Sequence, residues 1–546
     1  MMTRRRWSDD ERHTVGAEVA DAVVIGSGPN GLVAANALAD AGWDVVVLEA
    51  ADHFGGAVTS AEVTAPGFVT DMFSAFYPLA AASPIISDLE LGSHGLEWCR
   101  SPDVLAHALE DGRAAVLRSS VLDTATGLEE FAPGDGAAWV AMFEQWQRIR
   151  EPLLDALFTP FPPVTAVLAM LRELGAGGMV DFARLGLTPV RRLAQERFDG
   201  DGAALLLIGN AMHSDLPPDA AGSGMFGWLL AMLGQDVGFP VPRGGAGELA
   251  GALVRRARSK GAEVRTGAEV VSIHVRNGRA VGVALRDGST VRARRAVLAD
   301  VSAPALYQQL LGPGDVPPRV LRDLDRFQWD NATIKVNWAL SQPIAWTAPE
   351  ARRAGTVHLG VNVDGFVDFA ADLSTRRQPT APFILLGQMT TSDATRSPEG
   401  TESVWAYTHV PRQLDWSPER VAEQVRRVEG AVERVAPGFT ASQVARHVQS
   451  PADLEHDDAN LNGGAINGGT SGLHQQLFMR PTPGLGRPET PVGGLFLASA
   501  SAHPGGGVHG ACGWNAARAA LGASGPRGVV QRALVGTAWS RLLKDR

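Results

Sequence analysis

The stretch that decides the fold is DAVVIGSGPNGLVAANALA, residues 21–39. A short apolar run, a glycine turn and an alanine-rich segment follow one another, which predicts a strand, a tight turn and a helix. A helix that opens at Pro29 and Asn30 presents free amides and the positive end of its dipole to an anion. The turn has the GxGxxG spacing, in which the glycines allow the bend, the approach of a phosphate and close helix packing. These glycines are Gly26, Gly28 and Gly31.

A second apolar run, residues 44–48, follows this helix and ends in Glu49. An acidic residue at the end of the second strand accepts hydrogen bonds from a ribose hydroxyl, and it disfavours a ribose that carries a 2′-phosphate. Strand, glycines, helix, strand and acid occur in the order of a βαβ nucleotide-binding unit. We therefore predict a bound dinucleotide rather than a purely structural βαβ unit.

The continuation from Ala50 to Ser60 contains the pair Gly55 and Gly56, followed by Ala57. A glycine pair lets the backbone pass close to a cofactor without a Cβ atom in the way. In this respect the chain resembles the flavoprotein group that includes amine oxidases, carotenoid desaturases and Rab GDP-dissociation inhibitors, which place such a pair after the ribose acid. The resemblance implies that the dinucleotide is FAD and that residues 50 and 55–57 contact it. Carotenoid desaturases and amine oxidases usually carry arginine where this chain has Ala57, which argues against a carotenoid substrate.

Residues 494–520 contain a second glycine motif, in which a buried strand leads through three consecutive glycines into a helix of small residues. The bare turn exposes the amides of Gly506, Gly507 and Val508. Here the chain resembles the phytoene-desaturase-like FAD-dependent oxidoreductase family, and most closely the branch of pyridine nucleotide-disulphide oxidoreductase domain-containing protein 2. The resemblance extends from about Asp21 to Leu521. It implies flavin contacts at this turn and at Ser499, and a strand at Val270 that lies against the adenine.

His503 and His509 flank the glycine turn and are the catalytic candidates, because imidazole titrates near neutral pH. A structural hydrogen bond that caps the following helix is an equally open interpretation of both. Cys512 is better explained as a small core residue than as a redox thiol. Four residues are better explained as part of a loop over the flavin than as a metal site: His456, Asp457, Asp458 and Asn460. Asn467 and His474 are candidates for the pocket. Four more are candidates for the substrate site, and core packing is the simpler interpretation of each: Met212, His213, Trp228 and Trp329.

The order of the remaining segments predicts an α/β protein in which an FAD-binding Rossmann-like domain, of the GDP-dissociation-inhibitor and amine-oxidase type, is interleaved with an α+β substrate domain. Hairpin turns at Asn277-Gly278 and Asp287-Gly288 separate strands at 269–274, 281–285, 291–293 and 296–299. The expected FAD-binding segments are 20–85, 238–305 and 450–525. The expected substrate-domain segments are 86–237 and 306–449, and a helix is expected within 526–546.

The composition narrows the class of protein further. A formal net charge of -10 argues against a nucleic-acid partner, which would require a concentrated basic surface. Two cysteines, Cys99 and Cys512, form neither a disulfide framework nor a zinc site, which favours a cytoplasmic setting. The sequence shows no signal peptide and no uncharged apolar run long enough to span a membrane. Peripheral membrane contact through residues 171–197 or 529–543, and homo-oligomer formation, stay open.

Together these patterns predict an FAD-dependent oxidoreductase that takes a hydride from a C–H bond of an apolar or amphipathic small molecule onto flavin N5. Because the sequence has one dinucleotide turn, we expect reoxidation by oxygen or a quinone rather than by NAD(P). A flavin-dependent reductase, an isomerase and an amine oxidase are the alternative enzymes. A non-catalytic binding protein like the GDP-dissociation inhibitors is the alternative of another class.

Overall fold

The strand β1 (Glu18–Ile25) is the centre of the first of two seven-stranded sheets in this computed structural model, which describes residues 18–524. It pairs in parallel with β2 on one side and with β12 on the other, and its apolar residues are buried. Burial on both faces explains why the sequence here is a continuous apolar run. The other strands of this sheet are β2 (Val45–Leu48), β9 (Glu263–Arg265), β10 (Val270–Arg276), β11 (Arg279–Leu285), β12 (Thr290–Ala299) and β18 (Leu495–Leu497).

One strand of this sheet differs from the expectation. Residues 291–293 and 296–299 were expected as two strands, but they form the single strand β12. The two arginines between them, Arg294 and Arg295, lie at an irregularity in the pairing with β1 and are exposed. Both bind Asp21, at 2.8 and 3.2 Å, so they mark a bulge and not the end of a strand. The hairpin turn at Asn277-Gly278 is confirmed, because both residues have positive φ between the antiparallel β10 and β11.

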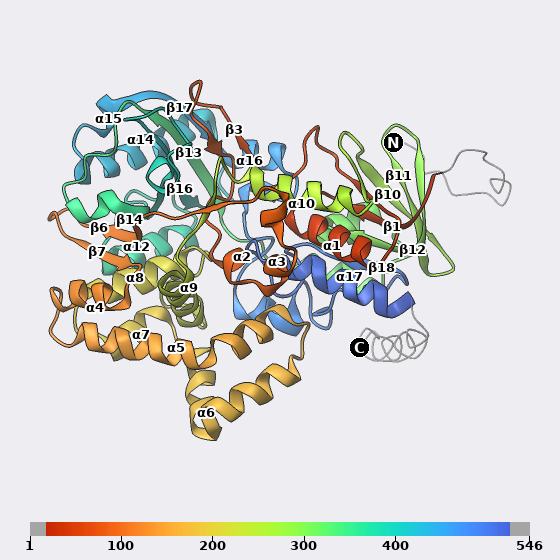
Figure 1. Ribbon diagram of the computed structural model, residues 1–546, viewed down its shortest axis with the longest axis horizontal. Coiled ribbons are helices and arrows are strands. Elements are labelled where there is room, and N and C mark those ends of the chain that lie inside the picture. The colour runs from red at the N-terminus through yellow and green to blue at the C-terminus, as the bar shows by residue number, and fades with distance from the viewer. Residues whose placement is uncertain (1–17, 525–546) are drawn as a thin grey trace.

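The second sheet lies beside the first and is mainly antiparallel, in the order β17-β13-β16-β15-β14-β6-β7 (Figure 1). Its strands are β6 (Asp103–Ala108), β7 (Ala114–Arg118), β13 (Ala332–Leu340), β14 (Ala354–Leu359), β15 (Ile384–Gln388), β16 (Glu402–Val410) and β17 (Gln443–Gln449). Two short pairs complete the strands: β3 (Ser60–Ala61) with β4 (Thr70–Asp71), and β5 (Trp98–Cys99) with β8 (Val241–Pro242). The α/β fold class is confirmed. The predicted domain boundaries stay a prediction.

Three apolar clusters form the core. The largest joins one face of the first sheet to the helices α1, α10 and α17 and continues into the helices beside the second sheet. A second cluster covers the opposite face of the first sheet, and a third packs α14 on the outer face of the second sheet. The longer helices are α1 (Pro29–Asp40), α4 (Val121–Glu129), α5 (Asp135–Phe158), α6 (Val164–Leu185), α7 (Val190–Arg197), α8 (Asp201–Met212), α9 (Ser223–Val237), α10 (Gly247–Ser259), α12 (Val363–Ser374), α14 (Pro418–Val435) and α17 (Ala511–Ser524).

The short helices lie mostly in the connections between these elements. They are α2 (Pro78–Ala82), α3 (Pro84–Asp88), η2 (Leu91–His94), η3 (Ala305–Leu310), α11 (Pro318–Leu324), η4 (Pro349–Arg353), α13 (Met389–Ser392), α15 (Phe439–Ser442), α16 (Pro451–Asp457), η5 (Asn462–Gly464), η6 (Leu473–Gln475) and η7 (Leu477–Met479).

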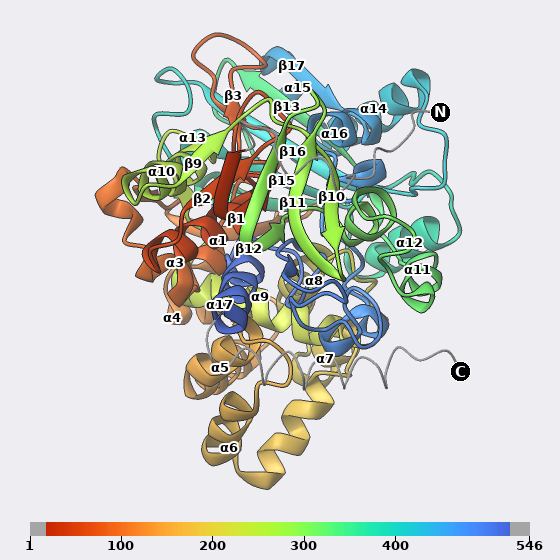
Figure 2. The same ribbon diagram turned by 90° about the vertical axis from the view of Figure 1, so that its right-hand side faces the viewer.

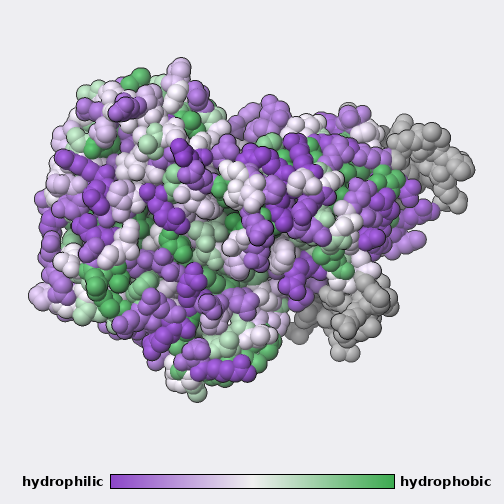
Figure 3. All heavy atoms as spheres, in the orientation of Figure 1, coloured by the Kyte–Doolittle hydropathy of each residue, from purple (hydrophilic) through white to green (hydrophobic). Residues whose placement is uncertain are grey.

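The helix α6 projects from the rest of the molecule (Figure 2). Hydrophobic and hydrophilic residues lie side by side on it at the lower edge of the surface in Figure 3. Within residues 18–524, none of the helices is both long enough and apolar enough to cross a membrane. Peripheral membrane contact stays a prediction, and segment 529–543 lies outside the described residues. The exposed apolar side chains of α6 are Val164, Val167, Leu168, Leu171 and Val180.

Candidate cofactor site and catalytic face

The first glycine turn joins β1 to α1 and is closed so tightly that side chains do not fit. A Cβ atom on Gly31 would lie 2.3 Å from the carbonyl oxygen of Gly26, and one on Gly28 would lie 2.8 Å from a carboxylate oxygen of Asp300. Gly26 itself has a φ of +92°, which favours glycine. The structure therefore gives a steric reason for each of the three glycines in the sequence motif.

Glu49 follows β2, and its side chain contacts Ser27 in this turn. One of its carboxylate oxygens accepts hydrogen bonds from the amide and the hydroxyl of Ser27, both at 2.7 Å. The other accepts a hydrogen bond from the amide of Ala51 at 3.0 Å. The side chain is thus held at the carboxyl ends of two neighbouring parallel strands, where a nucleotide ribose is bound in this type of fold.

Asp300 is a residue of this site that the sequence analysis missed. It follows β12 directly, and its carboxylate accepts a hydrogen bond from the amide of Gly31 at 2.7 Å. Burial raises the pKa of Asp300 to about 7, and the nearby carboxylates of Asp458 and Glu49 act in the same direction. Asp300 therefore occupies one of the amides at the start of α1, where free amides were expected. An acidic residue directly after a buried parallel strand was the signal that could have found it.

The glycine pair after Glu49 closes over the first turn. A Cβ atom on Gly56 would lie 3.2 Å from the Cα atom of Gly28 and 3.5 Å from a carboxylate oxygen of Asp458. Asp458 belongs to the loop predicted to cover the flavin, and burial raises its pKa to about 6. Asn460 in the same loop donates to the carbonyl oxygen of Asp300 at 3.2 Å. The structure brings this part of the loop to the turn, whereas His456 and Asp457 are exposed.

The second glycine turn leads into α17, which packs directly on α1. A Cβ atom on Gly513 would lie only 1.8 Å from the carbonyl oxygen of Asn30. The close contact brings the two glycine turns, from opposite ends of the chain, together at one edge of the first sheet. Gly506 and Gly507 are exposed, although the residues around them are buried or half-buried. A stretch of bare backbone therefore faces outward beside the first turn.

Arg480 is a second residue that the sequence analysis missed. Its guanidinium group is buried and donates to the carbonyl oxygens of Asn467 at 3.0 Å, Thr470 at 2.9 Å and Ala500 at 2.7 Å. Burial lowers the pKa of Arg480 to about 10, so the group stays charged near neutral pH. It holds the loop around Asn467 against the strand end that precedes the second turn. Its sequence surroundings carry no signal that distinguishes it from a surface arginine.

Asn467 lies beneath the second turn. A Cβ atom on Gly506 would lie 2.8 Å from its carbonyl oxygen, and its own amide donates to Asp330 at 2.9 Å. Burial raises the pKa of Asp330, and the carboxylate of Asp215 raises it further. Asn467 was a candidate for the pocket, and the structure brings it to the glycine turn. His474, the other candidate from this loop, is exposed and contacts Gln328.

Both catalytic candidates use a ring nitrogen in a structural contact. His503 donates from Nε2 to the carbonyl oxygen of Thr159, at 3.2 Å. His509 accepts from the amide of Ala511, the first residue of α17, at 3.0 Å. Burial lowers the pKa of each histidine to about 4, so both are neutral near neutral pH. These contacts favour the interpretation in which the two imidazoles shape the turn.

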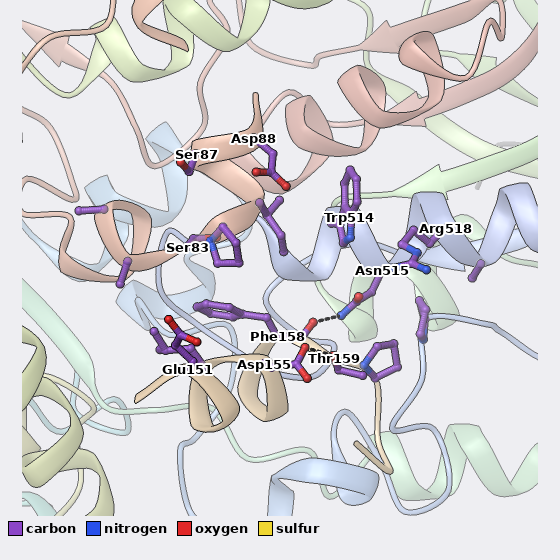
Figure 4. Close-up of a pocket in the computed structure, with 18 of the residues that line it drawn as sticks. Ser83, Ser87, Asp88, Glu151, Asp155, Phe158, Thr159, Trp514, Asn515 and Arg518 are labelled. Carbon is purple, nitrogen blue, oxygen red and sulfur yellow. Dashed lines mark hydrogen bonds between the residues drawn. The ribbon is translucent and has the colours of Figure 1, made fainter. Parts of the chain in front are cut away.

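A pocket of about 830 Å³ lies on the outer side of this turn, between α3, the end of α5 and α17 (Figure 4). Asn515 donates to the carbonyl oxygen of Phe158 at 2.9 Å, and the ring of Phe158 lies 5.5 Å from that of His509. The wall between the pocket and the turn is therefore made by the last residues of α5. His503 and His509 both contact this wall.

Lys335 links the cofactor edge to the second sheet. It lies on β13, and its Nζ donates to the carbonyl oxygens of Asp71 and of Phe73, the latter at 3.1 Å. The adjacent Ser74 donates to the carbonyl oxygen of Ala57 at 2.6 Å, directly after the glycine pair. Burial lowers the pKa of Lys335 to about 7. The sequence analysis missed this residue because a single lysine in a strand has no distinctive pattern.

Several polar atoms around the two turns are buried and have no hydrogen-bond partner within residues 18–524. They are Oδ1 of Asn30, Oγ1 of Thr59 and Nδ2 of Asn467. Buried polar groups are almost always paired in folded proteins, so these atoms indicate a bound polar molecule. Bare amides, an acid at the ribose position and a helix N-terminus fit an extended dinucleotide with a pyrophosphate.

The remaining candidates lie farther from the turns or serve as packing residues. Met212 and Trp228 are buried in the core, and Trp329 packs against Phe327. Cys512 is buried, as expected of a core residue, and burial raises its pKa to about 12, which favours the unreactive thiol form. Val270 is buried at the start of β10, and its predicted adenine contact stays a prediction.

Two glycine turns at one sheet edge, together with a second sheet over that edge, define a dinucleotide-binding flavoprotein. The model of the family of flavin containing amine oxidoreductases matches residues 30–521, and the chain belongs to this family. The cofactor is FAD, and the protein is an FAD-dependent oxidoreductase.

Individual relatives agree with this assignment. The chain is 30% identical to pyridine nucleotide-disulfide oxidoreductase domain-containing protein 2 of Mus musculus, over 91% of this chain and 92% of that protein. It is 26% identical to a zeta-carotene-forming phytoene desaturase of Myxococcus xanthus, over 89% of this chain and 90% of that protein. Among solved structures, putrescine oxidase bound to putrescine has the same fold, with a TM-score of 0.59 and 18% sequence identity. The match covers 95% of this chain and 100% of the putrescine oxidase chain. The resemblance stated from the sequence motifs is therefore confirmed.

Proposed function

We propose that the protein oxidises a C–H bond of an apolar or amphipathic small molecule, giving a desaturated or oxidised product. When bound, FAD supplies the redox chemistry by accepting a hydride from the substrate. The similarity to a phytoene desaturase over most of both chains supports a substrate of this class. Oxygen or a quinone is the proposed electron acceptor.

The proposed FAD site consists of the two turns and the residues that close over them. The glycine turns would bind the pyrophosphate and the flavin, Glu49 the ribose, and β10 the adenine. The proposed contacts are Gly26, Gly28, Pro29, Asn30, Gly31, Glu49, Ala50, Gly55, Gly56, Ala57, Val270, Ser499, Gly506, Gly507 and Val508.

The observation that carries the proposal is the position of Lys335. Its bonds to residues 71 and 73, and the bond of Ser74 to Ala57, join the glycine pair to the second sheet. The ring of Trp405, on the neighbouring strand β16, lies 5.6 Å from the Lys335 Nζ. Phe76 lies 5.9 Å from the same ring. Aromatic groups of this size provide apolar contact area for a substrate held beside the cofactor.

Lys335 also provides a group that can hold a proton. Loss of a hydride from one carbon and a proton from its neighbour gives a double bond, and the proton needs an acceptor. With a pKa of about 7, Nζ of Lys335 is partly unprotonated near neutral pH and can take this proton. His503 and His509 remain candidates for this role as well, but their ring nitrogens already make the structural contacts described above.

The experiment is anaerobic mixing of the FAD-loaded protein with terpenoids, fatty acyl compounds and amines, followed by the visible absorption of the flavin. Bleaching by a terpenoid or a fatty acyl compound is expected. Bleaching by amines alone, or reduction by dithionite but by no member of the panel, would contradict the proposal. His503→Ala then tests that residue. If it only shapes the turn, FAD affinity falls while the reduction rate of the FAD-bound fraction is unchanged.

A further inference from the structure

The inner face of the second sheet carries hydrogen-bonding side chains where an apolar surface would suffice for a hydrocarbon. Side chains alternate along β13, so that Ile334 and Val336 enter the outer core and Lys335 faces the opposite side. On the paired strand β16 the inward residues are Trp405, Tyr407 and His409, which the pairing places opposite residues 337, 335 and 333 of β13.

Three side chains on and beside this face each have a polar atom without a hydrogen-bond partner in the part of the chain that the structure describes. Nε2 of His409 is buried and has no hydrogen-bond partner within residues 18–524. The hydroxyl of Tyr407 makes no hydrogen bond with the described residues, and its side chain is only half-buried. His213, at the end of α8, is also half-buried, and its Nδ1 is free of contacts with described polar groups. An unpaired buried polar atom such as Nε2 of His409 is costly, so this arrangement indicates a polar ligand.

These groups lie close to one another. The rings of Tyr407 and His409 are 5.6 Å apart, and their planes are nearly perpendicular. Burial lowers the pKa of His213, and a positive charge on His409 acts in the same direction. Tyr407 in turn stacks on Trp405 at 5.9 Å, the ring that Lys335 contacts. A continuous row of side chains therefore leads from the cofactor edge to His409.

The contact of His213 with His358 decides the charge of this site. Their Nε2 atoms are 2.8 Å apart, so one ring donates and the other accepts, which requires at least the accepting ring to be neutral. Burial lowers the pKa of His213 to about 3 and that of His358 well below its usual value. Asp215, whose carboxylate acts electrostatically on Tyr407, already accepts two hydrogen bonds from Asn331. A neutral donor or acceptor placed here would be paired by these side chains without the cost of burying a charge.

We propose that Tyr407, His409 and His213 bind an uncharged oxygen-containing group of the substrate, a hydroxyl or a carbonyl. The substrate is then an oxygenated amphipathic molecule, with its apolar part along Trp405 and Phe76 and its polar end at the histidines. This inference rests on the proposed function, because it assumes that the second sheet binds the substrate. A hydrocarbon of the same skeleton would leave the three groups unpaired, and it is expected to bind on the order of tenfold more weakly or worse.

The test compares matched pairs of compounds, farnesol with farnesene and hexadecanol with hexadecane. Dissociation constants are measured on the FAD-loaded protein from the perturbation of the oxidised flavin spectrum, which does not require turnover. The alcohols are expected to bind about tenfold more tightly than the hydrocarbons. Tyr407→Phe removes one hydroxyl and should reduce this preference severalfold. The matched control is Tyr307→Phe, which removes a buried hydroxyl from the core on the far face of the first sheet and should leave the preference unchanged.

His213→Asn is the second variant, because it keeps a polar side chain at the end of α8 while changing its reach. It should also lower the preference for alcohols. Equal binding of alcohols and hydrocarbons by the unchanged protein would overturn the inference, as would a preference that survives both variants. Tight binding of alcohols without flavin bleaching by any member of the wider panel would overturn the proposed oxidation and leave this binding site supported.

Discussion

The contact between α1 and α17 offers the sharpest test of how the two glycine turns are held together. Gly513→Ala adds one methyl group whose carbon would lie 1.8 Å from the carbonyl oxygen of Asn30. Ordinary contact between such atoms begins near 3.4 Å, so the helices must separate by about 1.6 Å. Overpacking of this kind costs about 1–3 kcal/mol, and a backbone neighbour that cannot rotate away places this case at the upper end.

The matched control is Gly430→Ala in α14. A Cβ atom at Gly430 would have no neighbour within 4 Å. Alanine is favoured over glycine within helices by about 1 kcal/mol, so this variant is expected to be as stable as the unchanged protein or more so. The difference between the two variants isolates the steric term at Gly513 from the effect of helix propensity.

Two measurements check the prediction: the free energy of unfolding in denaturant and the dissociation constant for FAD. Gly513→Ala should lower the free energy of unfolding by about 2–3 kcal/mol and weaken FAD binding by at least about tenfold, since about 1.4 kcal/mol corresponds to a factor of ten. Gly430→Ala should neither lower the free energy of unfolding nor weaken FAD binding. If Gly513→Ala unfolds and binds FAD as the control does, close packing of α1 on α17 is not what positions the two turns.

Two further changes test the residues that the sequence analysis missed. Asp300 has a pKa raised from 3.8 to about 7, so the stability it contributes is present below about pH 4 and is lost as the pH rises through about 7. As the pH rises from about 4 to about 7, the free energy of unfolding of Asp300→Asn should therefore increase by up to about 4 kcal/mol relative to that of the unchanged protein. If the free energies of unfolding of the two proteins vary with pH in parallel, this reasoning is contradicted. Arg480→Lys keeps the charge but cannot reach the carbonyl oxygens of Asn467, Thr470 and Ala500 together. It should lower the free energy of unfolding by about 2–3 kcal/mol, and an unchanged denaturation midpoint would show that these bonds are dispensable.

The elements that could be predicted from the sequence are those fixed by neighbours along the chain. In the GxGxxG turn a Cβ atom on Gly31 would meet the carbonyl oxygen of Gly26 within the motif itself, and the hairpin at Asn277-Gly278 needs two residues that accept positive φ. Distant residues add to this requirement, because a Cβ atom on Gly28 would also meet Asp300. The local pattern was sufficient to predict these two segments, because each carries a constraint between residues close in sequence.

The parts that could not be predicted depend on contacts between distant segments. Asp300 binds an amide 269 positions earlier in the chain, and Arg480 binds carbonyl oxygens from both sides of its own segment. The roles of His503 and His509 stayed open for the same reason, because the carbonyl group that His503 binds belongs to Thr159. The local sequence shows that an imidazole precedes the turn, but it does not show which group forms a hydrogen bond with that imidazole.

The first sheet carries the cofactor edge and the second sheet carries the proposed substrate face, which explains why the cofactor is easier to assign than the substrate. Along β13, Ile334, Val336 and Trp338 build the outer core, and the residues between them face inward. An inward residue of this strand can therefore change without disturbing that outer core, although Lys335 also holds the segment at residues 71 and 73. Proteins with this fold can keep one cofactor site and differ in the substrates they take, so a TM-score of 0.59 with putrescine oxidase carries no information about the substrate. The inward residues Tyr407 and His409, rather than the fold, are where the substrate of this protein is specified.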